Sequence, residues 1–171
     1  MALAQNRKVS LIGLVVAVVA VLLAIALAPA QGTRMVHRSV GGTVALGATC
    51  THYPGAQVSI TAPGPGTVVV SATVGIGITH AQGTDDVALV VVANSQTACE
   101  MDNFTAFVSV PAGLPSAAYP ATHYFTTVPI LHPFAVGAGT HTYFVNGMMT
   151  VGGGPGDRFD SASLVAVFYP A

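Results

Sequence analysis

A long run of alternating side chains between Gln57 and Ala93 is the feature that most constrains the fold. From Val68 to Ile78 every second residue is apolar, with threonine, serine, glycine or valine in the places between. A period of two over this length is typical of a β-strand with one buried face. Turn-forming residues follow at Ala81–Asp85, and Val87–Ala93 is then a nearly continuous apolar run, as in a strand buried on both faces. We therefore predict a β-hairpin within an all-β sandwich.

Further strands are expected on both sides of this hairpin, separated by loops rich in proline and glycine. Pro129 and Pro133 should limit the far end of the strand that begins at His123, because proline cannot donate a ladder hydrogen bond. With the two strands above, about eight strands and no helix predict a two-sheet β-sandwich, jelly-roll-like, over residues 40–171. The remaining expected strands are Val40–Leu46, Val58–Thr61, Phe104–Val110, His123–Val128, Thr140–Asn146 and Ser161–Phe168.

The N-terminus carries an export signal. Arg7-Lys8 precede an apolar run at Val9–Ala28, which is long enough to cross a bilayer as a hydrophobic helix. Ala28-Pro29-Ala30 then offers a cleavage pattern. Residues 1–30 are accordingly a signal peptide or a signal anchor, and residues 31–39 a polar tether. We expect an exported domain, extracellular or on the cell surface, which is secreted or held in the membrane by residues 9–28 if these are uncleaved.

Charge is scarce throughout the sequence. Charged residues make up 6% of the chain, against about 25% in an ordinary soluble domain. Beyond residue 30 the chain has three arginines and six aspartate or glutamate residues. Without a basic patch to hold phosphates, nucleic acid is not an expected partner.

Two cysteines, Cys50 and Cys99, fit an exported domain with one disulfide. Closing a loop of about 50 residues would stabilise the fold by roughly 4 kcal/mol in the chain-entropy model. The alternative is a pair of unlinked buried thiols.

Candidate chemistry is sparse. No two of the six histidines have the close spacing of a metal motif, although ligands can converge from different strands. Asp85-Asp86 at the hairpin tip and Glu100 with Asp102 could supply oxygen ligands for calcium, but turn stabilisation is the plainer interpretation. Asp157 and Asp160 flank Arg158, which predicts a local ion pair. The histidines are His37, His52, His80, His123, His132 and His141.

No catalytic pattern is present in the sequence: there is no G-x-S-x-G, and neither cysteine has a motif around it. We predict no catalytic, metal or cofactor-binding residue, no cofactor and no enzymatic activity. Asn103-Phe104-Thr105 is an N-glycosylation sequon, which three residues produce readily by chance.

The strand phases also predict a core between two sheets. Either Leu89→Ala or Leu164→Ala in this core should lower the free energy of unfolding by about 2–5 kcal/mol. The residues expected there are Val70, Val74, Ile76, Leu89, Val91, Val108, Tyr143, Val145, Leu164 and Phe168.

Three segments carry a family resemblance: ITAPGPGTVVVSATV at 60–74, AGTHTYFVNG at 138–147 and SASLVAVFYP at 161–170. They resemble a bacterial branch of the jelly-roll superfamily that includes tumour necrosis factor and the complement globular head, and the likeness covers about residues 56–170. The resemblance implies a ligand-binding or structural trimer rather than an enzyme. The chain departs from that pattern because it has no collagen-like or other trimerising stalk.

These observations predict a non-catalytic extracellular binding or adhesion module with a glycan or protein ligand. The alternative is a structural subunit that self-assembles into a surface layer or filament, with strand edges open to pairing.

Overall fold

The computed structural model describes residues 33–118 and 123–171. The signal peptide or anchor predicted at residues 1–30 lies outside these ranges. Residues Gly32–Ala171 form one compact unit. None of the described residues belongs to a helix long and apolar enough to cross a membrane.

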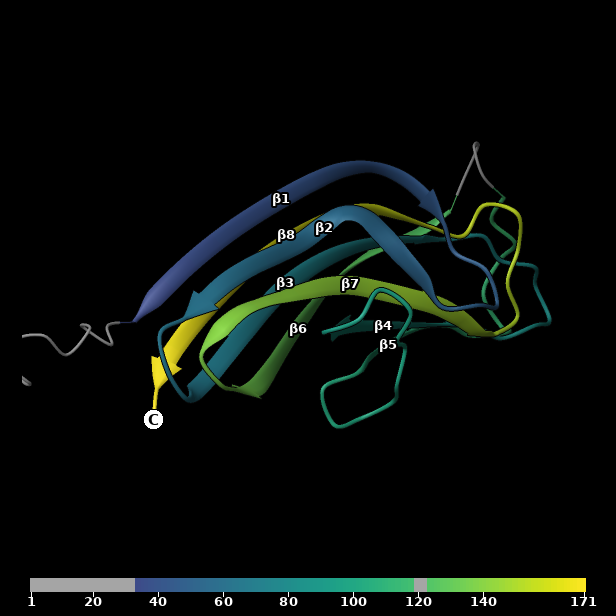
Figure 1. Ribbon diagram of the computed structural model, residues 1–171. Helices are drawn as coiled ribbons and strands as arrows, with labels where there is room; N and C mark the ends of the chain where they lie inside the picture. The colour runs from purple at the N-terminus through teal and green to yellow at the C-terminus, as the bar shows by residue number, and fades with distance from the viewer. Residues whose placement is uncertain (1–32, 119–122) are drawn as a thin grey trace, which may run out of the picture. The chain divides into compact units, whose positions relative to one another are not determined.

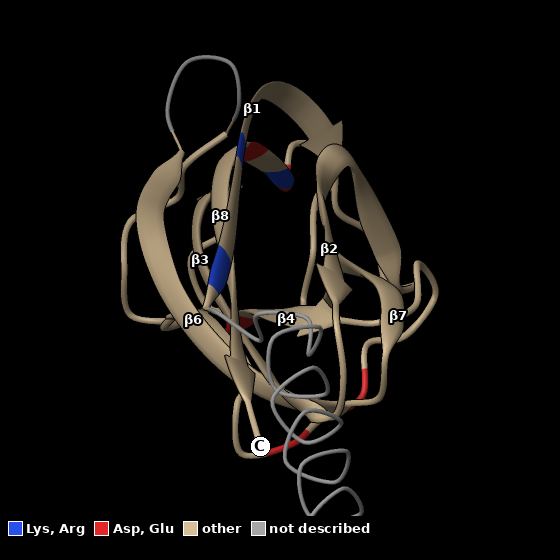
Figure 2. Cartoon of the chain, turned by 60° about the vertical axis from the view of Figure 1, so that its left-hand side comes forward, with Lys and Arg blue, Asp and Glu red and all other residues tan. Residues whose placement is uncertain are grey.

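Eight strands make up the domain, and they form two facing sheets (Figures 1 and 2). The strand order is β1-β8-β3-β6 in one sheet, called the β3 sheet here, and β2-β7-β4-β5 in the other, the β4 sheet. All pairings are antiparallel, and among the described strands only β4 and β5 are neighbours in both sequence and sheet. This is the jelly-roll arrangement, so the predicted two-sheet sandwich is confirmed. The strands are β1 Arg34–Ala45, β2 Thr51–Ala62, β3 Gly66–Ile78, β4 Asp86–Ala93, β5 Ala106–Val110, β6 Tyr124–Val136, β7 Gly139–Val151 and β8 Arg158–Pro170.

The predicted hairpin is wrong, although both of its strands exist. β3 pairs with β6 and β8, whereas β4 pairs with β5 and β7 across the sandwich. The small residues at Ala81–Asp85 reverse the chain as expected, but the reversal carries it from one sheet to the other. A turn signal and two apolar strands fit either outcome, because alternation records which face is buried and not which strand lies beside it.

The core lies between the two sheets, and the predicted alternation of β3 is confirmed. Every second residue from Val68 to Ile78 is at most 1% exposed, and Thr73 on the opposite phase is exposed. Seven of the ten predicted core residues are buried in this cluster, namely Val70, Val74, Ile76, Tyr143, Val145, Leu164 and Phe168.

The phase of β4 differs from the prediction. Ala88, Val90 and Val92 face the core, so Leu89 and Val91 point to the outer side of the β4 sheet, where they are nevertheless buried. A strand that is apolar on both faces gives no phase in the sequence. Val108 of β5 is only partly buried against the core, because β5 is a short edge strand.

Strand β1 begins at Arg34, so most of the predicted tether at residues 31–39 belongs to the fold. Its residues are nearly all exposed, and it is held by backbone pairing with β8 from Arg34↔Phe168 onward. An edge strand held by backbone pairing needs little apolar alternation in its side chains. Residues 34–39 lack that alternation, so the sequence predicted a later start, at Val40.

Strand β6 runs through Pro129 and Pro133 to Val136, well beyond the predicted end at Val128. β6 is the edge strand beside β3, and the two prolines lie four residues apart, so their nitrogens point the same way. Proline is tolerated on an edge strand where its nitrogen faces away from the neighbouring strand.

The predicted disulfide between Cys50 and Cys99 is present, with Cα atoms 5.6 Å apart. It joins the connection that precedes β2 to the loop that follows β4. That loop, residues 94–105, is called the Cys99 loop below.

Candidate functional site

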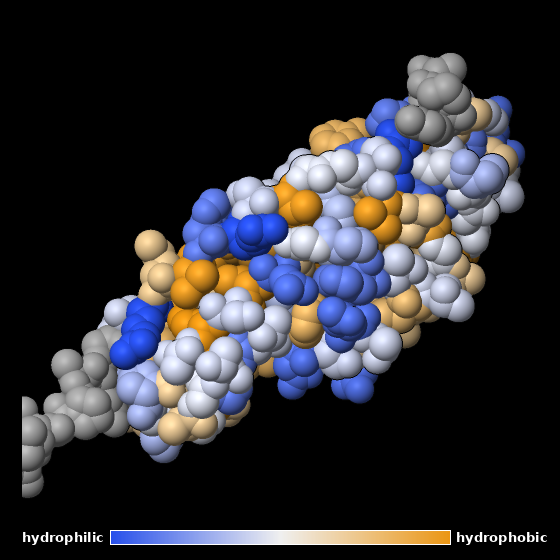
Figure 3. Space-filling model, turned by 45° about the horizontal axis from the view of Figure 1, so that its top comes forward, coloured by the Kyte–Doolittle hydropathy of each residue, from blue (hydrophilic) through white to orange (hydrophobic). Residues whose placement is uncertain are grey.

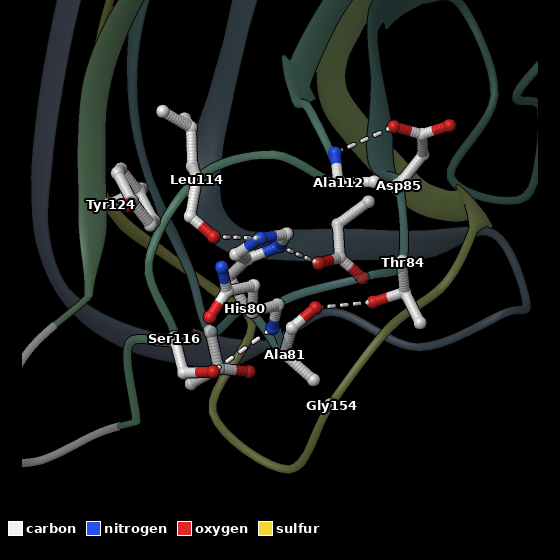
Figure 4. Close-up of polar contacts among 12 residues, drawn as sticks. His80, Ala81, Thr84, Asp85, Ala112, Leu114, Ser116, Tyr124 and Gly154 are labelled. Carbon is white, nitrogen blue, oxygen red and sulfur yellow. Dashed lines mark hydrogen bonds and ion pairs between the residues drawn. The ribbon is translucent and has the colours of Figure 1, made fainter.

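A buried histidine–aspartate pair lies where β3 ends and β4 begins (Figure 4). His80 Nδ1 lies 2.7 Å from Asp86 Oδ2, and the His80 side chain is fully buried. The other ring nitrogen, Nε2, lies 3.2 Å from the carbonyl oxygen of Leu114. Asp86 Oδ1 accepts a hydrogen bond from the backbone of Gly153 at 2.9 Å. The pair therefore ties together β3, β4, the loop before β6 and the loop before β8.

In many hydrolase sites an aspartate orients a histidine in this way toward a hydroxyl nucleophile. The chemistry open to His80 therefore depends on the partner of its second ring nitrogen, Nε2. The Leu114 carbonyl can only accept a hydrogen bond, so Nε2 is the donor in this contact. With Nε2 donating to a main-chain oxygen, no ring nitrogen faces a hydroxyl nucleophile. Nearby Thr84 and Ser116 bond to the backbone at Ala81 and Gln82 instead. The His80–Asp86 pair therefore holds the neighbouring loops together.

A second polar region surrounds the Cys99 loop, which three kinds of contact hold in place. Besides the disulfide, the fully buried Asn146 of β7 donates from Nδ2 to the carbonyls of Ser95 and Ala98 at 2.8 and 2.7 Å. At its far end Asp102 Oδ1 accepts from the Phe104 backbone at 2.8 Å, which closes a turn. The loop is thus fixed before any ligand arrives.

A groove separates the Cys99 loop from β6. β5 pairs only with Asp86–Val90, so the last part of β4 and the second half of β6 have no strand between them. The resulting hollow measures about 480 Å³, and a second hollow of about 480 Å³ shares Asn94 and Phe134 with it. The first is lined by Val91, Val92, Ala93, Asn94, Ser95, Thr97, Ala98, Glu100, Asp102, His132 and Phe134.

Aromatic rings form the β6 wall of this groove. His132 stacks on Phe134 with ring centroids 4.0 Å apart, and Phe104 of the Cys99 loop lies 4.7 Å from His132 on its other side. Phe134 in turn contacts Tyr143 at 4.4 Å. His132 Nε2 lies 3.6 Å from Asp102 Oδ2, so the loop and β6 approach each other here. The groove therefore has carboxylates and hydroxyls on the Cys99 loop and, along β6, aromatic rings that are stacked on one another.

A third feature is the outer face of the β3 sheet, which carries no charged side chain from the Tyr169 row to the Ser161 row. Strand register places one apolar row across all four strands, Met35, Val167, Val69 and Pro133. Large apolar side chains stand exposed on it, with Met35 at 72% and Leu131 at 58%. The outward residues of these rows are Met35, His37, Ser39, Thr67, Val69, Ser71, Thr73, Thr127, Pro129, Leu131, Pro133, Ala135, Ser161, Ser163, Val165, Val167 and Tyr169.

The side along β1 and β2 is different. Figure 3 brings this side forward and shows apolar patches interrupted by hydrophilic side chains. Arg34 and Arg38 stand on β1 here, and Arg38 Nε donates to the Gly55 carbonyl of β2 at 3.4 Å.

The other predicted histidines lie apart from one another. His37 Nε2 is 3.1 Å from Ser163 Oγ on the outer face, and His141 Nε2 is 3.0 Å from the Gly137 carbonyl. His52 packs edge-on to Phe144, and His123 accepts from Arg158 at 3.0 Å. Within residues 33–118 and 123–171, no three histidine, cysteine or acidic side chains gather as a metal site would require.

The carboxylates largely stabilise turns. Asp85 accepts from the Ala112 backbone at 2.8 Å, and the predicted ion pair forms between Arg158 and Asp160 at 2.8 Å. Asp157 instead accepts from Thr79 at 2.8 Å and from Gly154 at 2.6 Å. In the sequon Asn103 is exposed, and the Thr105 hydroxyl bonds to the turn at Asp102.

Two buried tyrosines are the groups with clearly displaced pKa values. Burial raises the pKa of Tyr143 to about 12. Burial, and secondly the nearby Asp160 carboxylate, raise the pKa of Tyr53, whose hydroxyl donates to the Gly42 carbonyl at 2.6 Å. Both stay neutral near pH 7, so their hydroxyls serve packing rather than acid–base chemistry.

Few of these contacts could be predicted from the sequence. His80 and Asp86 were each considered, but not as a pair, and the aromatic wall of Phe104, His132 and Phe134 was missed. One available signal was Asn146, a lone amide in the apolar and aromatic strand segment TYFVNGMM. A buried amide of that kind usually has a specific partner.

No protein-family model and no curated protein matches the chain. Similar solved structures come from infectious bursal disease virus. The Gx strain structure has a TM-score of 0.39 at 11% identity over 82% of this chain and 33% of that one. The VP2 subviral particle gives 0.36 at 11% identity over 81% and 33%, and the T13 viral particle 0.35 at 12% over 80% and 31%. The chain thus spans about a third of their length, and a likeness this weak carries no functional argument. The resemblance to the tumour necrosis factor superfamily stays a prediction.

Proposed function

We propose that this is an exported, non-catalytic β-sandwich subunit that associates with further copies of itself through the outer face of the β3 sheet. The observation that carries the proposal is the uncharged character of that face across four strands. Water is a poor solvent for the apolar row through Met35 and Val69, so covering it is favourable.

A second copy is the partner that suits this face best. A charged partner would lose hydration without finding an opposite charge, whereas an identical face presents only apolar, hydroxyl and ring groups. Four strands and about eight residues of length span roughly 19 by 27 Å. Two such faces together bury roughly 1,000 Å² of surface, without the extra area of protruding side chains. That area is about the minimum expected of a specific protein–protein interface.

The sheet edges argue against strand-to-strand polymerisation. β6 contains Pro129 and Pro133, and β5 has five residues. β1 and β2 have irregular register at Gly41–Val44 and His52–Gln57. Prolines, short strands and bulges are the devices that block edge pairing. Face-to-face packing therefore gives a closed oligomer, and the filament predicted as an alternative would need a second contact.

The experiment is to measure molar mass by sedimentation velocity for the parent protein and for Leu131→Arg. Leu131 is 58% exposed, so the substitution should leave folding intact while placing a charge on the face. Val151→Arg, at a 50% exposed position on β7, is the matched control. We expect the parent and control to be oligomeric and Leu131→Arg to be monomeric at the same concentration. A parent protein that is monomeric up to about 100 μM would refute the proposal.

The first predicted function, a binding or adhesion module, is the second candidate. The groove beside the Cys99 loop favours it, because this groove is preformed and has the volume of a small-ligand site. Its test is a glycan array probed with the full chain: saturable binding that Glu100→Gln weakens would support it, and no binding to any glycan would count against it.

A further inference from the structure

We infer that self-association through the outer face of the β3 sheet is controlled by pH, and that protonation of His37 releases the copies from one another. This inference rests on the proposed function, because it concerns the same face. It follows from the position of His37 within that face, from the uncharged groups around it and from the two hydroxyls that hold its ring.

His37 lies within the uncharged face and not at its end. Strand register places it in one row with Val165, Ser71 and Leu131, directly beside the apolar row that begins at Met35. The side chain is exposed when the subunit is alone. A second copy that covers the four strands therefore covers His37 as well.

His37 is the described residue of this face that changes charge near neutral pH. Histidine has an ordinary pKa of about 6.5, which brings its change of charge into the range between about pH 5 and pH 8. Tyr169 is the other ionisable side chain in these rows, and a tyrosine ordinarily ionises near pH 10. Mild acid therefore adds a charge to this face at His37.

The neighbouring strand β8 offers this charge no partner. Val165 is paired with His37 on β8. The carboxylate of β8, Asp160, lies outside the rows of the face and is already ion-paired with Arg158 at 2.8 Å. A protonated His37 would therefore stand beside an apolar side chain and not beside an opposite charge.

The remaining groups near β1 are neutral or positively charged. Arg34 and Arg38 stand on the opposite phase of β1 and have the same sign of charge as a protonated histidine. β2, which approaches β1 from the other sheet, has His52 and Tyr53 as its titratable residues and contains neither aspartate nor glutamate. Among the described neighbours, a charge on His37 is therefore stabilised by hydration alone.

A second copy does not supply the missing counter-charge. Two aligned sheets that face each other across a two-fold axis place β1 opposite either β1 or β6 of the other copy. The outward residues of both strands in these rows include no carboxylate. A protonated His37 would lose hydration in the contact without gaining a partner, and this loss opposes association.

The uncharged form of His37 is suited to a covered face. Its Nε2 lies 3.1 Å from Ser163 Oγ and 3.1 Å from Ser39 Oγ. A hydroxyl can either donate to a ring nitrogen or accept from it, so these serines satisfy Nε2 in either neutral tautomer. This ring nitrogen therefore needs no water when a second copy covers the face.

Association that requires an uncharged His37 must weaken as the pH falls. Between about pH 7.5 and about pH 5.5, the uncharged fraction of a histidine of ordinary pKa falls about tenfold. A dimer contains His37 twice. The dissociation constant of the dimer should therefore rise by about tenfold to about 100-fold over this range.

The test is sedimentation velocity of the full chain at about pH 7.5 and about pH 5.5, at one protein concentration. His37→Gln keeps a polar group beside the two serines but cannot be protonated, so it should associate equally at both pH values. His141→Gln is the matched control, because His141 lies on β7 in the other sheet and bonds to the Gly137 carbonyl. It should dissociate in acid like the parent, and circular dichroism verifies that each protein stays folded at both pH values.

Acid dissociation of the parent and of His141→Gln, together with unchanged association of His37→Gln, supports the inference. A parent that is oligomeric to the same extent at both pH values would overturn it and leave the proposed self-association intact. Acid dissociation that persists in His37→Gln, or that accompanies unfolding of the parent, would overturn it as well. A parent that is monomeric already at about pH 7.5 would refute the proposed function and this inference together.

Discussion

Asn146 provides a direct test of how the Cys99 loop is held. Its side chain is 0% exposed, and its amide nitrogen donates to the Ser95 and Ala98 carbonyls. Asn146→Ala removes both hydrogen bonds while leaving β7 and the disulfide in place. The loop should then be tied at Cys99 and at its ends, with two carbonyls lacking their donor.

The magnitude follows from the contacts. Each hydrogen bond contributes about 1 kcal/mol net, and each carbonyl left without a partner adds a desolvation cost. Asn146 Oδ1 has no partner among the described residues, so its removal recovers part of that cost. We expect the free energy of unfolding to fall by about 2–3 kcal/mol.

Urea unfolding followed by circular dichroism measures this loss, with Asn103→Ala as the matched control. Asn103 is exposed in the same loop, and its removal should cost less than about 0.5 kcal/mol. Hydrogen exchange should also quicken in residues 94–105 of Asn146→Ala. Equal losses in the two variants would show that Asn146 does not hold the loop.

Three further predictions concern the core, the pH dependence and the disulfide. Leu164→Ala should lower the free energy of unfolding by about 2–5 kcal/mol, because Leu164 is fully buried between the sheets, and exposed Thr73→Ala by less than about 0.5 kcal/mol; equal urea midpoints would contradict the assigned faces. The folded Tyr143 keeps its proton to about pH 12, whereas an unfolded tyrosine releases it near pH 10, so stability should fall between these values, and less steeply in Tyr143→Phe; an identical alkaline slope in both would disprove this. Cys50→Ala with Cys99→Ala should cost about 4 kcal/mol, measured by thermal unfolding against the oxidised parent, and an unchanged melting temperature would be the contrary result.

Some of this molecule could be predicted from local pattern. The alternation from Val68 to Ile78 reports the buried face of β3 because a pleated strand sends successive side chains to opposite sides. The same logic identified the buried residues of β7 and β8, such as Tyr143 and Leu164. Scarce cysteines in an expected export context predicted the Cys50–Cys99 disulfide, since two thiols allow one pairing.

Pairing partners could not be obtained in this way. The chain turns at Ala81–Asp85 whether the next strand lies alongside or crosses to the other sheet, and the free energy that separates these outcomes comes from long-range packing. Edge strands were misjudged for a related reason. β1 and the second half of β6 are held by backbone pairing with β8 and β3, which local side-chain patterns do not record.

The sequence by itself determined an all-β domain with low charge, a defined set of buried side chains and one disulfide. Tertiary structure alone decided which surfaces are available for function. It placed His80 against Asp86 and the Leu114 carbonyl, and it gathered Glu100 and Phe134, which lie on different elements, around one groove. It also aligned Met35, Val167, Val69 and Pro133 in one row. Strand order and register bring residues far apart in the chain into contact, whereas local propensity acts over only a few residues.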